Sequence, residues 1–141
     1  MYYKNIVQVE VTTACQAACT FCPRTALKAN WLSKNLVWEH FTPVLASLNG
    51  STLVHLQGWG EPLLHPRLWD MAAAVRQRKG KVSLTTNAML MDESARREIM
   101  RIGLEFVCIS LADADCAGNA SLRTDTDLNR ISANIEHLCG L

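Results

Sequence analysis

Residues 6–22 read IVQVEVTTACQAACTFC, a strand-like run that is followed at once by three closely spaced cysteines. The first six of these residues alternate apolar and polar side chains, which is the pattern of a β-strand. Cys15, Cys19 and Cys22 come next, with the spacing Cys-x3-Cys-x2-Cys. This stretch therefore predicts a strand whose carboxyl end carries a thiol-rich loop.

Three further strand-like segments follow, at residues 53–56, 81–86 and 106–111. The last of them is continuously apolar, as expected of a parallel strand covered on both faces. Cys108, in its middle, is therefore expected to be a small core side chain. The first connection between strands is much longer than the others, and long loops in compact domains are usually functional.

Helical periodicity fills the gaps between these strands. The order β-α-β-α-β-α-β-α predicts an α/β fold of parallel (β/α) repeats, with about four βα units present. An open doubly wound sheet and part of a TIM-like barrel both fit this order. The predicted helices cover residues 37–48, where Pro43 is an early interruption, 66–79, starting near Pro66, 93–102, with Asp92 as N-cap and Gly103 as the end, and 128–138, ending near Gly140.

The composition fits one globular domain of 141 residues, 49% of them hydrophobic. A net charge of +1 gives no electrostatic footprint for nucleic acid or for an anionic membrane. The sequence contains no signal-peptide pattern and no apolar run of transmembrane length, so a cytoplasmic location with reduced thiols is expected.

The cysteine spacing alone leaves several kinds of site open. Thiolates suit iron–sulfur clusters, and three cysteines on one loop can hold three irons of a cubane. A zinc site with His40, His55 or His65 as the fourth ligand is an alternative, as are incidental buried cysteines. Since no fourth cysteine is nearby, the fourth iron of a cubane would be open to another ligand.

A residue of a type that is common in binding or catalytic sites follows each predicted strand. Cys15 follows the first, Gly58 the second, Asn87 the third and Asp113 the fourth. In both candidate architectures the carboxyl ends of the strands meet at one edge, where ligands gather. These positions are therefore expected to lie close together.

The cysteine motif, with Phe21 just before its third cysteine, resembles the signature of the radical S-adenosylmethionine (SAM) superfamily. In that family Cys15, Cys19 and Cys22 would hold a [4Fe–4S] cluster, and SAM would chelate the fourth iron. The reduced cluster cleaves SAM to methionine and a 5′-deoxyadenosyl radical, which abstracts hydrogen from a substrate. The resemblance places Phe21 near the adenine.

Residues 58–62, Gly-Trp-Gly-Glu-Pro, resemble the family's Gly-Gly-Glu-Pro motif. Glycine permits close backbone approach, so Gly58 and Gly60 would present backbone groups to the SAM amino group, with Glu61 as a charged acceptor. Trp59 replaces the first glycine of the usual motif's pair and would form a wall of the SAM site. In isolation the same residues would be a turn with a solvated glutamate.

Two weaker matches follow the third and fourth predicted strands. Thr86 and Asn87 resemble part of a Thr-Thr-Asn-Gly motif and would face the methionyl part of SAM, although Ala88 replaces the glycine. After the fourth predicted strand, Ala112 stands where the family has an aspartate. Ser110 is therefore a better candidate than residue 112 for contacting the ribose of SAM. Arg123 resembles an arginine that often follows the fourth strand.

The resemblance implies that residues 1–141 are one radical SAM core domain, an incomplete TIM-like barrel that stops before its last two strands. It implies a reductant such as flavodoxin or ferredoxin, and it suggests a peptide or a cofactor precursor as substrate. Without the missing strands the chain can bind a cluster and still fail to cleave SAM. The alternatives are a non-enzymatic iron–sulfur electron carrier and a Cys3His zinc-binding module. No residue is assigned as general acid or base, and Cys116 and Cys139 lack the spacing of an auxiliary cluster.

Overall fold

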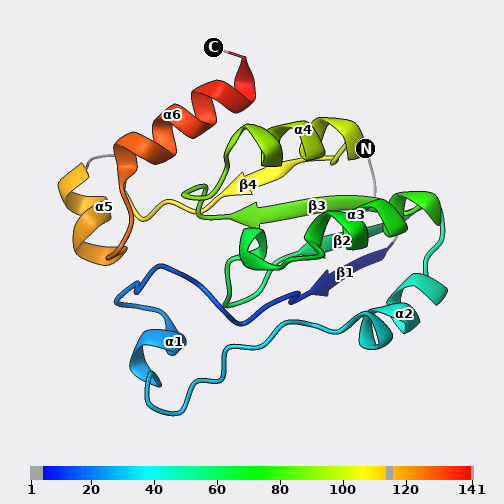
Figure 1. Ribbon diagram of the computed structural model, residues 1–141, viewed down its shortest axis with the longest axis horizontal. Helices are drawn as coiled ribbons and strands as arrows, with labels where there is room; N and C mark the ends of the chain where they lie inside the picture. Colours follow the sequence, from blue (N-terminus) through cyan, green and yellow to red (C-terminus); the bar gives the residue numbers. More distant parts are fainter. Residues whose placement is uncertain (1–4, 114–115, 141) are drawn as a thin grey trace.

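The computed structural model describes residues 5–113 and 116–140. Its four strands form one parallel sheet whose order follows the chain. Figure 1 shows the strand arrows pointing the same way, toward the end of the sheet where two short helices, α1 (Pro23–Ala26) and α5 (Cys116–Leu122), lie. The predicted α/β fold of parallel repeats is confirmed. The strands are β1 (Asn5–Val9), β2 (Thr52–Leu56), β3 (Lys81–Thr86) and β4 (Val107–Ile109).

One face of the sheet packs against α2 (Trp38–Ala46), α3 (Leu68–Gln77) and α4 (Glu93–Ile102). Alternate side chains of a strand point to the same face, so every second residue of β2 and β3 enters this core. The resulting cluster is fully apolar and holds the sheet rigid beneath its carboxyl edge. Its members include Phe41, Val54, Leu56, Met71, Val75, Val82 and Leu84.

A second, smaller core forms where α6 (Leu128–Cys139) packs on α4 and the β3–α4 connection. Ile131 of α6 is fully buried there with Met91 and Ile99. The ends of α4 are those that the sequence predicts. Asp92 Oδ1 accepts a hydrogen bond from Ala95 N at 2.8 Å, and Gly103 ends the helix with a left-handed φ of 71°.

The other face of the sheet is polar near the carboxyl ends of β2 and β3. His55 Nδ1 lies 2.7 Å from Ser83 Oγ, and His55 Nε2 lies 2.9 Å from Thr85 Oγ1 and 2.8 Å from Gln57 Oε1. The Phe106 ring centroid is 5.8 Å from the His55 ring. The imidazole of His55 is therefore engaged by neighbouring strands.

The expectation that residues 106–111 form a fully covered strand is wrong. Strand β4 is short, Phe106 and Leu111 are 39% and 46% exposed, and Cys108 is exposed rather than a core side chain. The reason is its position at the edge of the described sheet, where only β3 pairs with it. Val107 and Ile109 still pack on the second core, whereas Cys108 lies on the face that no described helix covers.

Other boundaries differ more modestly. Strand β1 ends at Val9 instead of residue 11, and α2 continues through Pro43. A proline lacks only its own N–H, and the Pro43 carbonyl still accepts a bond from Ser47 N at 3.2 Å. The sequence did not predict α1 or α5.

Among residues 5–113 and 116–140, no helix is both long and apolar enough to cross a membrane.

Candidate functional site

The long connection after β1 is an ordered loop that folds back on itself. Thr13 N donates to Lys34 O at 2.9 Å, and Leu36 N donates to Val11 O at 2.7 Å. The Trp31 indole Nε1 donates to Thr13 O at 2.9 Å. These bonds close the base of the loop, so its cysteine-bearing tip is presented from a fixed frame.

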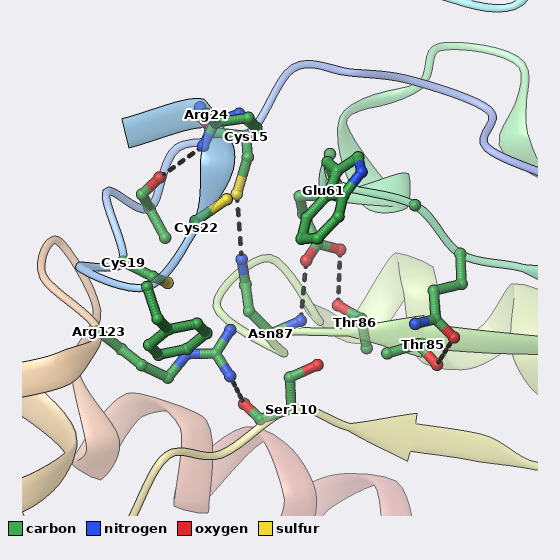
Figure 2. Close-up of a pocket in the computed structure, with 16 residues that line it drawn as sticks. Cys15, Cys19, Cys22, Arg24, Glu61, Thr85, Thr86, Asn87, Ser110 and Arg123 are labelled. Atoms are coloured by element: carbon green, nitrogen blue, oxygen red, sulfur yellow. Dashed lines mark hydrogen bonds between the residues drawn. The ribbon is translucent and has the colours of Figure 1, made fainter. Parts of the chain in front are cut away.

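The three cysteines lie at that tip, beside the carboxyl end of the sheet (Figure 2). Cys22 is the N-cap residue of α1, and its N–H donates to Cys19 O at 3.1 Å. Cys19 is buried, whereas Cys15 and Cys22 are half-buried. Burial raises the pKa of the Cys15 thiol, so binding of a metal by this cysteine must displace a proton.

Gly60 brings the segment after β2 into direct contact with the start of the cysteine loop. A Cβ atom at this position would lie only 2.0 Å from Thr12 O, so only glycine fits. The next residue fixes the contact, because Glu61 N donates to Ala14 O at 2.7 Å. One residue earlier, Trp59 N donates to Glu10 Oε1 at 2.5 Å. Residues 58–61 therefore form one wall against residues 10–14.

Glu61 is buried, with 2% of its surface exposed, and is not the solvated turn residue of the alternative interpretation. Its carboxylate accepts bonds from Thr86 Oγ1 at 2.6 Å and from Asn87 N at 2.8 Å, and so ties β2 to the end of β3 (Figure 2). Burial raises the pKa of the Glu61 carboxyl above its ordinary value, against these bonds and the charge of Arg123, which favour ionisation.

Asn87 reaches from the end of β3 toward the cysteines. Its Nδ2 lies 3.8 Å from Cys15 Sγ, and its Oδ1 accepts a bond from Gln16 Nε2 at 2.9 Å. Thr86 is committed to Glu61, so its hydroxyl serves the frame of the site. Ala88, which replaces a glycine of the family motif, adopts the left-handed conformation that glycine favours, with φ at 59°.

The far side of the site comes from the segment between α5 and α6. Ala18 N donates to Thr124 O at 3.1 Å, and Thr20 N donates to Leu122 O at 2.9 Å. The Thr124 hydroxyl also donates to Ala18 O. We call this pairing of residues 18–20 with 122–124 the latch. It places Arg123 beside the cavity, where the guanidinium donates to Ser110 O (Figure 2).

A single open cavity brings together every residue that the sequence predicts for the metal and cofactor sites. Phe21 and Trp59 are its most exposed members, at 63% and 55%. The predicted residues that line it are Cys15, Cys19, Phe21, Cys22, Gly58, Trp59, Gly60, Glu61, Thr86, Asn87 and Ser110. Their individual roles toward a cofactor stay predictions.

Sequence reasoning missed four residues of this cavity: Ala17, Arg24, Gln57 and Thr85. Gln57 and Thr85 each precede a motif residue at a strand end, so their positions carried a usable signal. Arg24 comes two residues after Cys22, and this position alone carries no signal of a role in the site. Its side chain turns back to the carbonyls of Cys15 and Ala17, a long-range contact that no local pattern shows.

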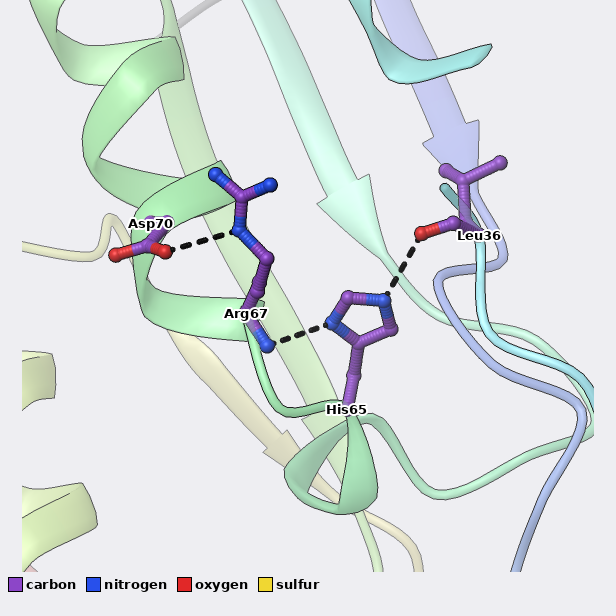
Figure 3. A network of polar contacts seen from close by, with 4 residues as sticks. All are labelled: Leu36, His65, Arg67 and Asp70. Atoms are coloured by element: carbon purple, nitrogen blue, oxygen red, sulfur yellow. Dashed lines mark hydrogen bonds and ion pairs between the residues drawn. The ribbon is translucent and has the colours of Figure 1, made fainter. Parts of the chain in front are cut away.

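The donor set of this cavity does not fit a Cys3His zinc site. Among the described residues, no histidine lines the cavity, and no three potential metal-ligand side chains converge on one ion. His40 lines a different surface hollow, and His55 is bonded within the sheet face. His65 fixes a turn, because its Nε2 donates to Leu36 O at 3.1 Å while Nδ1 accepts from Arg67 N at 3.0 Å (Figure 3).

The same donor set does fit a cubane cluster. A cubane spreads its irons over several sites, so its thiolate ligands need not meet at one point. Three thiols at the tip of one loop face a single cavity, and no fourth thiol or imidazole is among its lining residues. If a cubane were bound there, its fourth iron would have no thiol or imidazole ligand among these lining residues. Cys139 is exposed on α6, and the side chain of Cys116 lies outside the described part of the structure.

The sequence profile of the Radical SAM superfamily matches residues 9–139. The chain therefore belongs to the radical SAM superfamily, as the cysteine motif predicts.

Three curated relatives show the range of named activities. A tungsten-containing aldehyde ferredoxin oxidoreductase cofactor-modifying protein of Pyrococcus furiosus is 25% identical over 73% of this chain. A PqqA peptide cyclase of Streptomyces rochei is 28% identical over 81%, and a GTP 3′,8-cyclase of Chlorobaculum tepidum is 26% identical over 95%. The matches cover 29%, 31% and 41% of these relatives, so the chain spans well under half of their lengths.

Solved structures share the fold. A structure described as native anSMEcpe with bound AdoMet superposes with a TM-score of 0.76 at 21% identity, covering 96% of this chain and 40% of that one. The crystal structure of methylornithine synthase (PylB) gives a TM-score of 0.74 at 13% identity, covering 99% and 42%. These superpositions agree with the incomplete barrel that the sequence predicts.

Proposed function

We propose that this chain carries the cluster-binding and SAM-binding part of a radical SAM enzyme. The observation that carries the proposal is the single cavity in which the three thiols face the Gly58–Glu61 wall and the Asn87 amide. When bound, the [4Fe–4S] cluster supplies the electron that cleaves SAM to methionine and a 5′-deoxyadenosyl radical, which takes hydrogen from a substrate.

Cys15, Cys19 and Cys22 hold three irons in this proposal. The backbone of Gly58 and Gly60 lines the cavity and approaches the methionyl end of SAM, while Glu10 and Thr12 occupy the space where the two Cβ atoms would lie. The buried Glu61 carboxylate offers its charge to the SAM ammonium while it anchors the end of β3.

Asn87 orients the same end of SAM, Ser110 faces the ribose, and the exposed Phe21 ring covers the adenine. Trp59 forms an outer wall that limits the access of water. The chain's contribution to the reaction is thus to bind, orient and shield the cofactor.

The proposed substrate is a peptide or a cofactor precursor; among the named relatives, one is a cofactor-modifying protein and another is a peptide cyclase. The proposed electron donor is a small carrier of the flavodoxin or ferredoxin type, and the proposed setting is the cytoplasm. Residues 1–141 are proposed to be part of one core domain, in line with the 29% to 41% of the relatives that the matches cover.

Anaerobic reconstitution with iron and sulfide tests the cluster. We expect a brown protein with about four irons per chain, the content of one cubane. Cys19→Ala should lose most of this iron, whereas Cys139→Ala, which changes an exposed thiol outside the cavity, should keep it. Stoichiometric zinc without uptake of iron would overturn the proposal.

Binding of SAM is a separate test on the reconstituted protein. We expect SAM to change the electron paramagnetic resonance spectrum of the dithionite-reduced cluster, because it occupies the open iron. Asn87→Ala should weaken this response, and Asn30→Ala, in the cysteine loop but outside the cavity, should not. A spectrum that is unchanged at saturating SAM would favour the non-enzymatic electron carrier.

A further inference from the structure

Arg24 occupies a central place in the cysteine loop, although none of the cofactor roles above uses it. Its Nη2 donates to Cys15 O at 2.8 Å, and its Nη1 donates to Ala17 O at 2.9 Å (Figure 2). A guanidinium presents its donors in a rigid planar fork, so two such bonds fix the direction of both carbonyls. The side chain therefore connects α1, directly after Cys22, to the backbone of Cys15.

The charge of Arg24 also faces the thiols. The side chain lines the same cavity as the three cysteines, and its guanidinium carries a permanent positive charge. A cluster held by three thiolates becomes more negative when it accepts an electron. A nearby fixed positive charge favours that reduced state, because the attraction grows with the negative charge of the cluster.

Arg24 lines two hollows of the protein. It lines the cysteine cavity on one side and, on the other, a smaller hollow formed with Ala17, Ala18, Thr25 and Lys28. The side chain of Arg24 is therefore shared by the cysteine cavity and the hollow beside Lys28.

We propose that Arg24 is a positioning residue for the cluster, one that fixes the Cys15–Cys22 loop through two carbonyls and raises the reduction potential by its charge. This inference rests on the proposed function. It is independent of SAM, of the substrate and of turnover. It assigns to one side chain both the geometry of the ligand loop and the ease with which the cluster accepts an electron from dithionite or a protein carrier.

Two variants separate the fork from the charge. Arg24→Gln keeps hydrogen-bond donors and removes the charge, whereas Arg24→Lys keeps the charge and removes the planar fork. Arg97→Gln is the matched control, because Arg97 lies on α4 outside the cavity with a largely exposed side chain. All four proteins are reconstituted as full chains, and iron content, midpoint potential and the spectrum of the reduced cluster are measured.

We expect Arg24→Gln to shift the midpoint potential to more negative values, and Arg97→Gln to leave it at the parent value. Arg24→Lys should keep a potential close to that of the parent but bind less iron and show a broader spectrum of the reduced cluster. A parent-like potential in Arg24→Gln, or parent-like iron content and line width in Arg24→Lys, would each overturn the corresponding half of the proposal.

Circular dichroism of the unloaded variants shows whether each one folds. If Arg24→Gln does not fold, the Arg24→Lys measurements decide the positioning role, and Arg24→Met, an unbranched side chain without the charge, replaces Arg24→Gln in the measurement of the midpoint potential. A parent-like potential in Arg24→Met would count against the charge. If the parent binds no cluster, the proposed function fails. If the parent binds a cluster and the Arg24 variants have the same potential and iron content as the parent, the proposed function holds and only this inference is rejected.

Discussion

At the scale of single residues, the site depends on residues that their neighbours in the fold hold in one conformation. Glu61 is the clearest case, because a buried carboxylate is surrounded by donors from the end of β3. Gly60 is the steric counterpart, since its lack of a side chain lets two backbone segments touch. Both residues are part of one five-residue motif, and each can be tested without any cofactor.

The Glu61 carboxyl predicts a particular pH dependence of stability in the unloaded chain. Its pKa is raised in the folded state above the ordinary value of 4.5, so the folded state binds more protons than the unfolded state between the two values. The free energy of unfolding therefore falls as pH rises through this window.

Glu61→Gln should remove that contribution. The free energy of unfolding of the parent minus that of the variant, measured by urea unfolding at several pH values, should be largest below pH 4.5 and decrease as pH rises above it. Taking the difference cancels the other titrating groups. A difference that increases with pH would mean that the hydrogen bonds outweigh burial and hold the pKa low.

Gly60→Ala should destabilise the chain, because the new methyl group would meet Thr12 O at 2.0 Å and Ala14 O at 2.7 Å. Both atoms belong to the backbone, so the contact can be relieved only if the backbone of residues 58–61 moves away from residues 10–14. The expected loss is about 2 kcal/mol or more. Gly50→Ala is the control, since its nearest contact would be an ordinary 3.8 Å. Equal unfolding free energies for the two variants would refute the close approach.

At the scale of elements, the carboxyl ends of β2 and β3 position the site through the connections that follow them. The β3–α4 connection turns sharply at Ala88, whose carbonyl accepts a bond from Asn134 Nδ2 of α6 at 2.7 Å. Met89 N donates to Asn87 Oδ1 at 3.0 Å within the same turn. The direction of the Asn87 side chain therefore depends on the left-handed backbone of its neighbour.

Ala88→Val should disturb this turn strongly. A β-branched side chain is poorly accommodated at a φ of 59°, and Ala88 is fully buried. We expect a loss of about 2 kcal/mol or more in urea unfolding, together with weaker binding of SAM. Ala88→Gly should stay within about 1 kcal/mol of the parent, because relief of strain offsets the lost methyl contact and the greater freedom of the unfolded chain.

Local patterns predicted most of these elements, since strands β2 and β3 and helices α3, α4 and α6 have clear periodicity and end signals. For strand β4 the local pattern gave the wrong prediction. Its apolar residues indicate a covered strand, but coverage depends on which elements lie beside it. The same limit applies to the site. The motifs identified Cys15, Gly60 and Asn87, whereas Arg24 depends on a carbonyl contact that exists only after the loop has folded.

At the scale of the whole molecule, two segments that lie far apart in the sequence pair with each other beside the open cavity. The latch pairs residues 18–20 with 122–124 through two backbone bonds and the Thr124 hydroxyl. It carries Arg123 on the same strip, so the position of this cation follows the position of the cysteine loop. The first and last parts of the described chain thus both contribute residues to one site.

Thr124→Val should weaken the latch without removing its backbone bonds. We expect faster hydrogen exchange at the amides of Ala18 and Thr20, and a loss of about 1 kcal/mol in the free energy of unfolding. Ser121→Ala is the control, because its hydroxyl donates only to Gly118 O within α5. Exchange at Ala18 that is the same in both variants would show that the Thr124 hydroxyl does not support the pairing.

The latch also determines when the site can form during folding. Its hydrogen bonds join residues 102 and 106 positions apart, which makes it a contact of very high sequence separation. Closing so long a chain segment is entropically costly, so the pairing becomes favourable only after the sheet and its helices have brought the two segments near each other. During synthesis, the three cysteines emerge from the ribosome long before residues 122–124, with which their loop pairs in the latch. Iron delivered after the latch has closed would meet a finished ligand set, whereas iron delivered earlier would meet three cysteines on an open loop.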